Sequence, residues 1–497
     1  MATTQLILDP VAAFIGREHG LLIGGEEVDA RAGGRFDVVD PATGETIATA
    51  PRAEQEDVND AVAAARAAFP AWRDTPPAVR AELLWQLGVR IAELQDEFAQ
   101  IEALDNGKPT TESHLVDVPL CSSLFKYYAG WTTKIDGQTS TPSYGRFHTY
   151  TRREPVGVVG AIIPWNFPLL MCGYKLGPSL AAGCTVVLKP AEQTPLAALR
   201  LAELITEVGF PPGVVNVVTG FGEGAGAPLA AHPGVDKITF TGEHTTGQKI
   251  IEASKGNLKR VSLELGGKSP TLVFDDANLD EALEGTHGAV FFNQGQCCIA
   301  GARVFVHESV REEFTARLVE RARGIRLGSG LDPETTMGPL VSAEQLERVT
   351  GYIELGKQEG AQVAAGGVRA SGDGLDAGYF VEPTVMTDVN SEMRVMREEI
   401  FGPVALVGSF SDEDEAVRLA NDTHFGLAAG IFTRDVKRAH RVAAAVDAGT
   451  VWVNTYGMFD AAIPYGGFKM SGFGKELGRE ALDLYLQTKT VWVDLAE

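Results

Sequence analysis

Cysteine is scarce in this sequence, with 5 in 497 residues. A small, odd number of cysteines in a long chain does not fit a disulfide framework, and it suits a reducing compartment. The sequence also lacks CxxC pairs and clusters of histidine and cysteine at the spacing of metal ligands, so we expect no metal site. Two of the few cysteines are adjacent, Cys297 and Cys298.

The sequence also has few positively charged residues and no long apolar runs. The 43 Lys and Arg residues are outnumbered by 66 Asp and Glu, which leaves a net charge of −23. Such a chain repels the phosphates of nucleic acid and of anionic membranes. No apolar run approaches the ~20 residues that span a bilayer, and the first ten residues lack the basic start and apolar core of a signal peptide. We therefore expect a cytoplasmic protein whose partner is a small molecule, with no nucleic acid and no membrane.

What the sequence does contain is two series of short β-branched runs that alternate with helical segments. The length of the chain predicts two or three domains. The runs of the first series are residues 156–163, 185–189, 214–218, 237–241 and 261–265. Alternation of this kind predicts βαβ units and a parallel, doubly wound sheet that binds ligands at the carboxyl ends of its strands. A second α/β domain is predicted from the runs 271–274, 304–307, 404–410, 430–432 and 450–454.

Other elements are expected outside these two series. Residues 57–69 predict an alanine-rich helix, and a second helix is expected to begin with Thr75 as the N-cap and Pro76 at the first helical position. Residues 136–153 and the tail 485–494 both have strand-like patterns. An unpaired strand is a template for association.

Residues 291–303 surround the adjacent thiols with an amide-rich turn and a run of small residues. A cysteine attacks a carbonyl as its thiolate. It therefore needs a nearby base or positive potential, and a donor for the oxyanion that it creates. The alternative is that Cys297 and Cys298 are buried as small hydrophobic residues.

Three further motifs favour a catalytic thiol. They are Pro-Trp-Asn-Phe-Pro at 164–168, Leu-Glu-Leu-Gly-Gly-Lys at 263–268 and Glu-Glu-Ile-Phe-Gly-Pro at 398–403. Together with the cysteine segment, and in this order, they resemble the signature motifs of the NAD(P)-dependent aldehyde dehydrogenase superfamily over about residues 21–493. The resemblance implies a Rossmann-type cofactor domain (residues 1–135 and 154–266), an α/β catalytic domain (267–470) and a small β oligomerisation element (136–153 and 471–497). It also implies a homotetramer or a homodimer.

The resemblance assigns a role to each residue of the chemical site. Cys298 is the nucleophile, and the Asn166 amide and the Cys298 backbone N–H stabilise the oxyanion. Glu264 activates the water that hydrolyses the thioester. Lys175 supports the site, and Glu476 lies on a proton or water route. The alternatives are that Glu264 is a carboxylate bonded to backbone at the end of a strand, and that Lys175 and Glu476 are structural.

A cofactor site is predicted where the run 237–241 leads into a turn with glycine at both ends, Gly242 and Gly247, and then a helix. Glycines let the backbone approach a pyrophosphate, and a helix N-terminus offers free N–H groups. Glu243 departs from the family pattern, because a carboxylate there repels phosphate unless it points away. The resemblance places Lys189 and Glu192 at the adenosine ribose, where a carboxylate accepts hydrogen bonds from the ribose hydroxyls and repels a 2′-phosphate, which favours NAD over NADP. The cofactor-binding residues matched in this way are Ile162, Pro164, Trp165, Lys189, Glu192, Gly222, Phe240, Gly242, Gly247, Leu265, Glu399 and Phe401.

The resemblance also assigns the wall of the substrate tunnel to Leu120, Phe167, Tyr174, Cys297, Ile299, Phe459 and Tyr465. This set is apolar, with four aromatic rings and no charge, which favours a hydrophobic or aromatic aldehyde such as phenylacetaldehyde. A medium-chain aliphatic aldehyde and betaine aldehyde remain alternatives, as does an inactive structural relative. Transfer of the acyl group to coenzyme A is disfavoured, since relatives of that kind typically lack the glutamate at the position of Glu264.

Overall fold

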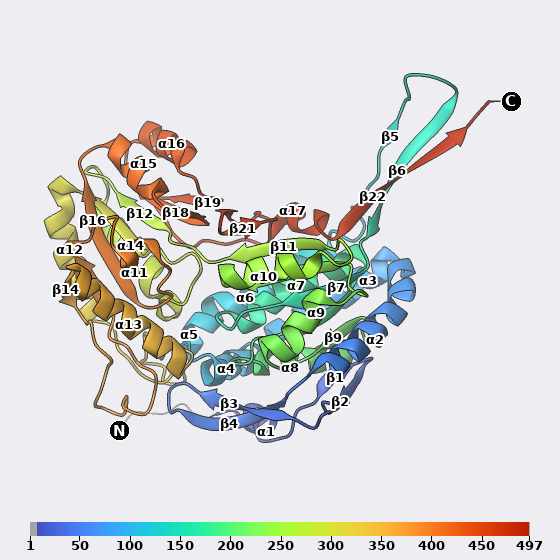
Figure 1. Cartoon of the computed structure of the whole chain (residues 1–497), viewed down its shortest axis with the longest axis horizontal. Helices are drawn as coiled ribbons and strands as arrows, with labels where there is room; N and C mark the ends of the chain where they lie inside the picture. Colours follow the sequence, from blue (N-terminus) through green and yellow to red (C-terminus); the bar gives the residue numbers. More distant parts are fainter. Residues whose placement is uncertain (1–6, 497) are drawn as a thin grey trace.

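A computed structural model describes residues 7–496. Two α/β halves lie side by side, and an antiparallel arm that ends near the C-terminus projects from one of them (Figure 1). Residues 1–6 and Glu497 lie outside the described residues. Residues 1–6 are part of the N-terminal segment from which the absence of a signal peptide is predicted. None of the described helices is long and apolar enough to cross a membrane.

The first half is built on an eight-stranded sheet whose five central strands are parallel, as the first series of runs predicts. In spatial order the strands are β2 (Glu26–Val28), β1 (Leu21–Ile23), β9 (Val215–Val217), β8 (Thr185–Lys189), β7 (Val158–Ile162), β10 (Lys237–Gly242), β11 (Arg260–Leu265) and β21 (Gly472–Phe473). The antiparallel edge strands β1, β2 and β21 are only two or three residues long, so they give no periodic pattern in the sequence.

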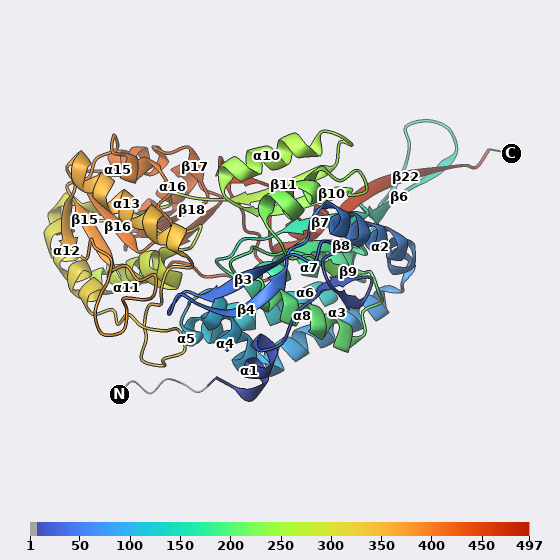
Figure 2. The ribbon, with the colours of Figure 1, turned by 60° about the horizontal axis from the view of Figure 1, so that its bottom comes forward.

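Helices cover both faces of this sheet because its strands are apolar on both sides. Val158 and Ile162 pack on one face, and Val159 and Ala161 pack on the other. The first face is covered by α2 (Gln55–Asp74), α9 (Ala227–Ala231) and α10 (His244–Ser254), and the second by α7 (Pro168–Ala182) and α8 (Leu196–Val208), with α3 (Pro77–Glu93), α4 (Gln95–Asp105) and α6 (Val118–Ala129) outside them (Figure 2).

The start of α3 differs from the prediction. The helix begins at Pro77, so Pro76 and not Thr75 is its N-cap residue. Thr75 ends the preceding helix α2, and its hydroxyl donates to the carbonyl of Ala71 at 2.8 Å. A threonine between two helices can serve either one, and here its side chain bonds back along α2.

The second half contains a seven-stranded sheet. In spatial order its strands are β14 (Gln362–Ala365), β15 (Thr384–Thr387), β16 (Val404–Phe410), β13 (Arg303–His307), β12 (Pro270–Val273), β18 (Ala428–Phe432) and β19 (Thr450–Val453), all parallel except β14. Successive residues of a strand again pack on opposite faces of the sheet, for example Leu272 and Val273. The helices on these faces are α11 (Leu279–Phe291) and α12 (Glu308–Arg323) on one, and α13 (Ala343–Glu359), α15 (Glu413–Asn421) and α16 (Val436–Ala445) on the other.

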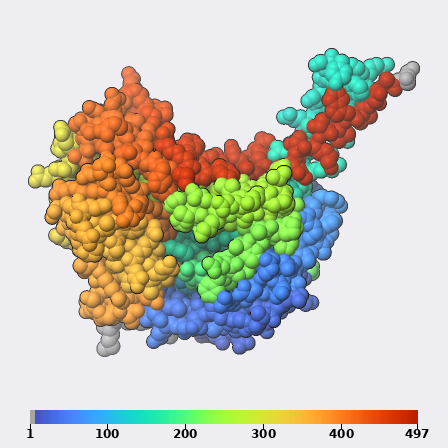
Figure 3. Space-filling model, in the orientation of Figure 1, coloured from blue at the N-terminus to red at the C-terminus, as the bar shows by residue number. Residues whose placement is uncertain are grey.

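The arm is a three-stranded antiparallel sheet of β22 (Leu486–Asp494), β6 (Phe147–Pro155) and β5 (Thr139–Ser140). Segment 136–153 is therefore not one strand, because β5 and β6 are separated by a loop. Residues 472–473 join the first sheet as β21, and the short α17 (Gly478–Asp483) packs against α7, so the arm receives only β22 from the C-terminal segment. The arm stands clear of the two halves (Figure 3).

Candidate active site

Two cavities meet at Cys298, between the two halves of the molecule. The first, of about 370 Å³, lies at the carboxyl ends of β10 and β11. The second, of about 230 Å³, lies beyond the cysteine and is lined mostly by apolar side chains. The residues that line both cavities are Phe167, Met171, Cys298 and Tyr465. In Figure 3 the surface is hollowed where the orange part of the chain meets the green helices.

Cys298 lies in a tight turn after α11 and is partly exposed to these cavities. Its Sγ lies 3.2 Å from the phenol oxygen of Tyr465. Contact with the Cys297 thiol, and then burial, raise the pKa of Cys298 well above its ordinary value. Cys297 lines the second cavity only, so the two thiols have different surroundings.

The turn before the cysteines is held in an unusual conformation by buried polar side chains. Asn293 and Gln294 have φ of 49° and 57°, in the left-handed region that non-glycine residues rarely adopt. The backbone N–H of Asn293 donates to the Glu112 carboxylate at 3.0 Å. Its side-chain amide donates to the carbonyl of Asn166 at 2.7 Å. These bonds tie the cysteine turn to the Pro-Trp-Asn-Phe-Pro segment.

The amide of Asn166 lines the first cavity, as Cys298 does. The side chain is buried, and its Nδ2 donates to the carbonyl of Gln296 at 2.9 Å, which leaves one amide N–H free. Within residues 7–496 the backbone N–H of Cys298 donates no hydrogen bond. The Asn166 amide and the Cys298 backbone N–H are therefore neutral donors that are free to bind an oxyanion without introducing a charge.

Glu264 comes from β11 and points into the first cavity, on the same side as the thiol. The residue is 3% exposed, and its Oε1 has no hydrogen-bond partner among the described residues. Burial, followed by the charges of Cys298 and Glu476, raises the pKa of Glu264 well above its ordinary value; Lys175 and Tyr465 offset part of this. No backbone N–H in the described chain donates to this carboxyl group. The structure therefore does not support the alternative that Glu264 is a carboxylate bonded to backbone at the end of a strand.

Lys175 and Glu476 form a buried ion pair behind the site. The backbone N–H of Glu476 donates to the carbonyl of Tyr465, and that of Tyr465 donates to the carbonyl of Glu476, both at 2.7 Å. The pair therefore anchors the segment that carries Tyr465. This position is compatible with a structural role and with a proton route from Glu264.

The predicted cofactor residues gather along the carboxyl ends of the parallel strands. Lys189 is the register partner of Ile162, which is in turn the partner of Phe240. The ammonium of Lys189 pairs with Glu192 at 3.1 Å. The first cavity is lined by Pro164, Trp165, Gly242, Leu265, Glu399 and Phe401, whereas Ile162, Lys189, Glu192, Gly222, Phe240 and Gly247 do not line it.

The turn into α10 fits a phosphate group. Its N-cap residue Glu243 makes no side-chain capping bond, so the first N–H groups of the helix are available. A Cβ at Gly247 would lie 2.8 Å from the Leu265 side chain, so glycine lets the helix pack closely on β11 without moving that side chain. The exposed carboxylate of Glu243 accepts a hydrogen bond from the Thr245 hydroxyl. It therefore bonds back to its own helix, although it still lines the cavity.

The opposite wall of the first cavity is a strained loop that helix α13 holds in place. Phe401 has φ of 61°, and its ring lies edge-on to Trp165 with centroids 5.2 Å apart. Gln345 donates to the carbonyl of Phe401 at 2.6 Å, and Arg348 donates to that of Glu399 at 2.6 Å. Burial raises the pKa of Glu399 to about 7. Glu344, Gln345 and Arg348 were missed from the sequence because they belong to an ordinary amphipathic helix far along the chain.

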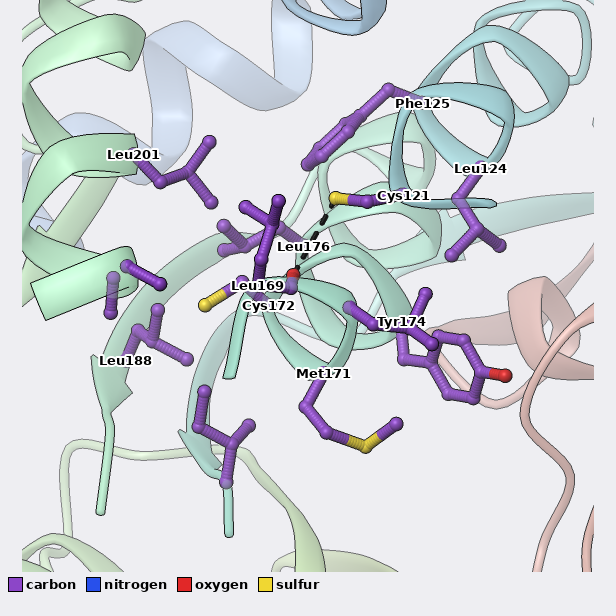
Figure 4. Close-up of a cluster of buried hydrophobic side chains, with 14 of the residues drawn as sticks. Cys121, Leu124, Phe125, Leu169, Met171, Cys172, Tyr174, Leu176, Leu188 and Leu201 are labelled. Carbon is purple, nitrogen blue, oxygen red and sulfur yellow. Dashed lines mark hydrogen bonds between the residues drawn. The ribbon is translucent and has the colours of Figure 1, made fainter. Parts of the chain in front are cut away.

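The second cavity contains six of the seven residues predicted for the tunnel wall. Phe167, Tyr174, Cys297, Ile299, Phe459 and Tyr465 line it. Leu120 does not; it is half-buried and packs against the main core. Figure 4 shows Met171 and Tyr174 projecting from α7 away from Leu188 and Leu201, which pack on its other side.

Other residues that line the second cavity were missed, namely Leu115, Val116, Leu170, Met171, Gly288, Ala289, Phe292, Tyr456 and Gly457. Helical spacing from Phe167 and Tyr174 could have identified Leu170 and Met171, because positions three and four apart share a face. Leu115 and Val116 lie in a π-helical turn, Ser113–Asp117, which breaks that spacing.

Comparison with known proteins gives consistent matches. The model of the aldehyde dehydrogenase family matches residues 28–491. An aldehyde dehydrogenase of Enchytraeus buchholzi is 50% identical over 477 residues, which are 95% of each chain. Human aldehyde dehydrogenase 1A1 is 48% identical over 96% of this chain and 95% of its own. The structure of a Bacillus cereus aldehyde dehydrogenase in complex with NAD+ matches with a TM-score of 0.97 at 49% identity, over 99% of this chain and all of the other.

Proposed function

We infer that this chain, which belongs to the aldehyde dehydrogenase family, is an NAD-dependent enzyme that oxidises an aldehyde to a carboxylic acid. Its preferred substrate is a hydrophobic or aromatic aldehyde such as phenylacetaldehyde. The observation that carries the proposal is the meeting of two cavities at one thiol. One cavity lies at the strand ends where dinucleotides bind in parallel sheets, and the other is apolar. A sulfur at the junction can hold a substrate carbon between them.

The residues of the first cavity and its rim fit NAD. The free N–H groups at the start of α10 suit the pyrophosphate, and Lys189 with Glu192 suits the adenosine ribose. Glu399 and Phe401 suit the nicotinamide ribose and ring. The cofactor, when bound, supplies the oxidising power by accepting a hydride from the substrate carbon. The Bacillus cereus relative was solved with NAD+ bound.

The remaining chemistry belongs to side chains of this protein. Cys298 attacks the aldehyde carbon to give a thiohemiacetal, whose oxyanion accepts hydrogen bonds from Asn166 and from the Cys298 backbone N–H. Oxidation converts the thiohemiacetal to a thioester. Glu264 then takes a proton from water, which hydrolyses the thioester. A Cβ at Gly267 would lie 2.5 Å from the carbonyl oxygen of Cys298, so glycine here lets the Glu264 segment approach the cysteine turn.

Replacement of Glu192 by glutamine is expected to reduce the preference for NAD over NADP by about tenfold, equivalent to about 1.4 kcal/mol. The carboxylate repels a 2′-phosphate and also neutralises Lys189, which becomes available to that phosphate in the variant. The measurement is kcat/KM for each cofactor at a fixed aldehyde concentration.

The matched control for this experiment is Glu252→Gln, which removes an exposed carboxylate of α10. It is expected to leave the ratio of the two cofactors unchanged. A preference of the unmodified enzyme for NADP would contradict the assignment of Glu192.

The substrate preference is proposed from the wall of the second cavity. Trp452, Phe459 and Tyr465 form a chain of aromatic contacts, with ring centroids 5.8 Å and 5.1 Å apart. Phe167 stacks with Phe292 across centroids 6.1 Å apart. No arginine or lysine lines this cavity, so a phosphorylated or carboxylated aldehyde would find no partner.

Phenylacetaldehyde is therefore expected to exceed acetaldehyde in kcat/KM by about thirtyfold. Burying a phenyl ring instead of a methyl group contributes roughly 2 kcal/mol at about 25 cal/mol per Å². A panel of phenylacetaldehyde, hexanal, acetaldehyde and betaine aldehyde, followed by NADH absorbance, tests both the function and the preference. Absence of NADH formation with every aldehyde would overturn the proposed function.

The variant Phe459→Ala separates an aromatic site from a generally apolar one. It is expected to weaken turnover of phenylacetaldehyde more than turnover of hexanal, because a ring loses an edge-to-face partner that an alkyl chain does not use. Equal efficiencies for these two aldehydes in the unmodified enzyme would leave an aldehyde dehydrogenase with an unselective apolar tunnel.

We also propose that the enzyme is a cytoplasmic homotetramer or homodimer. All five cysteines are free, which suits a reducing compartment. The arm supports assembly, because β22 is a nine-residue edge strand with exposed apolar side chains, including Trp492 and Val493.

A further inference from the structure

The phenol of Tyr465 is in direct contact with the sulfur of Cys298. The two atoms are 3.2 Å apart, within hydrogen-bond distance for sulfur. The residue is only 4% exposed, and it lines both cavities. The resemblance to the family assigns Tyr465 to the tunnel wall. An aromatic ring without a hydroxyl would be enough for that role.

Few other groups around Cys298 could stabilise its thiolate. No helix begins at Cys298 itself, so its own backbone does not place the sulfur at a helix N-terminus. The two nearby ammonium groups are engaged elsewhere, since Lys175 pairs with Glu476 and Lys475 donates to the carbonyl of Gly466. The titratable and charged groups around the thiol, phenol and carboxyl are Tyr174, Lys175, Glu264, Cys297, Glu399, Tyr456, Lys475 and Glu476.

Tyr465 and Glu264 line the same cavity, and Tyr465 acts to lower the pKa of that carboxyl against the larger opposing effects of burial and of Cys298. As a hydrogen-bond donor, the phenol also lowers the pKa of the Cys298 thiol, against Cys297 and burial. Burial raises the pKa of Tyr465 itself well above its ordinary value, so the phenol keeps its proton and can act as a donor.

The position of the phenol is fixed by its surroundings. Two backbone hydrogen bonds of 2.7 Å join Tyr465 to Glu476. The ring packs edge-on against Phe459, with centroids 5.1 Å apart. A donor held in this way needs no rearrangement when charge develops on the sulfur.

We propose that Tyr465 is a further catalytic residue, whose phenol donates a hydrogen bond to the Cys298 thiolate and so favours the ionised form of the nucleophile. The phenol keeps its own proton, and only its hydrogen bond strengthens as charge develops on the sulfur. The inference rests on the proposed function, because it takes Cys298 as the nucleophile.

The variant Tyr465→Phe tests the donor role, since it keeps the ring and removes only the hydroxyl. The rate of Cys298 alkylation by iodoacetamide is measured against pH, without cofactor or aldehyde, with Cys298→Ala correcting for the other thiols. The midpoint is expected to rise by about one pH unit, so that alkylation below the midpoint is about tenfold slower. Tyr128→Phe is the matched control, because its buried hydroxyl donates to the carbonyl of Gly478 and the residue lines neither cavity. Its midpoint is expected to stay that of the unmodified enzyme.

An unchanged midpoint in Tyr465→Phe would overturn the donor role. These measurements use no aldehyde, so failure of the proposed function, seen as no NADH formation, is distinguishable from failure of this inference.

Discussion

Cys298→Ala is expected to lower kcat for aldehyde oxidation by a factor on the order of 10⁴ or more, because it removes the atom that forms the covalent bond. Binding of NAD is expected to stay nearly intact. The sulfur lies where the two cavities meet, whereas the α10 turn, Glu192 and the Glu399–Phe401 loop lie elsewhere along the first cavity and its rim. The measurements are NADH formation for activity and titration calorimetry for the cofactor.

Cys297→Ala is the internal control, one residue away along the chain. Cys297 lines the second cavity only, so its loss is expected to change the rate or the substrate preference modestly. It also removes the thiol contact that raises the pKa of Cys298, and the alkylation midpoint should fall. If the two variants gave the opposite pattern of activity, the assignment of the nucleophile would be wrong.

The sheets of this protein could be predicted from the sequence because both faces of their strands are buried. Runs such as Thr185–Lys189 and Val404–Phe410 are short and centred on apolar and β-branched residues, and the structure places strands over those same residues. The short antiparallel edges were missed for the opposite reason. A strand such as β21, with two residues, carries no period that a sequence pattern could reveal.

The candidate site was predicted less completely than the sheets, and the difference has a physical cause. Residues in motifs, such as Asn166 and Glu264, could be identified because several unusual residues stand close together in the sequence. Gln345 and Arg348 act on the cofactor loop from a helix about 50 residues away, through bonds to backbone carbonyls. Bonds of this kind require a long polar side chain at a suitable distance, which no local pattern encodes.

Tyr465 shows the same limit for a residue whose position was predicted. The resemblance predicts an aromatic ring in the tunnel wall, and Tyr465 lines the second cavity. Only the structure shows that its hydroxyl lies 3.2 Å from the sulfur of Cys298, 167 residues away in the chain. The chemical role proposed for the phenol depends on that distance and could not be derived from the ring alone.

Glu264→Gln is expected to slow thioester hydrolysis by about 10²–10⁴-fold while the acyl-enzyme still forms, because a neutral amide cannot take a proton from water. The trace should show a burst of NADH that approaches the concentration of active sites, followed by slow turnover. The experiment is done above the pH midpoint for Cys298 alkylation, where the thiol is already ionised. Trapping of the thioester and its detection by mass spectrometry provide a second measurement.

The electrostatics of the site explain why Glu264 can act as a base at this step. After burial, the charge of Cys298 is the largest cause that raises the pKa of Glu264. Acylation converts the sulfur to a neutral thioester, so this contribution disappears, and the pKa of Glu264 falls in the intermediate that must be hydrolysed. Lys175 continues to favour the carboxylate, whereas the glutamine variant cannot respond to either charge. Equal loss of the burst and of steady-state turnover would instead place the role of Glu264 before the oxidation step.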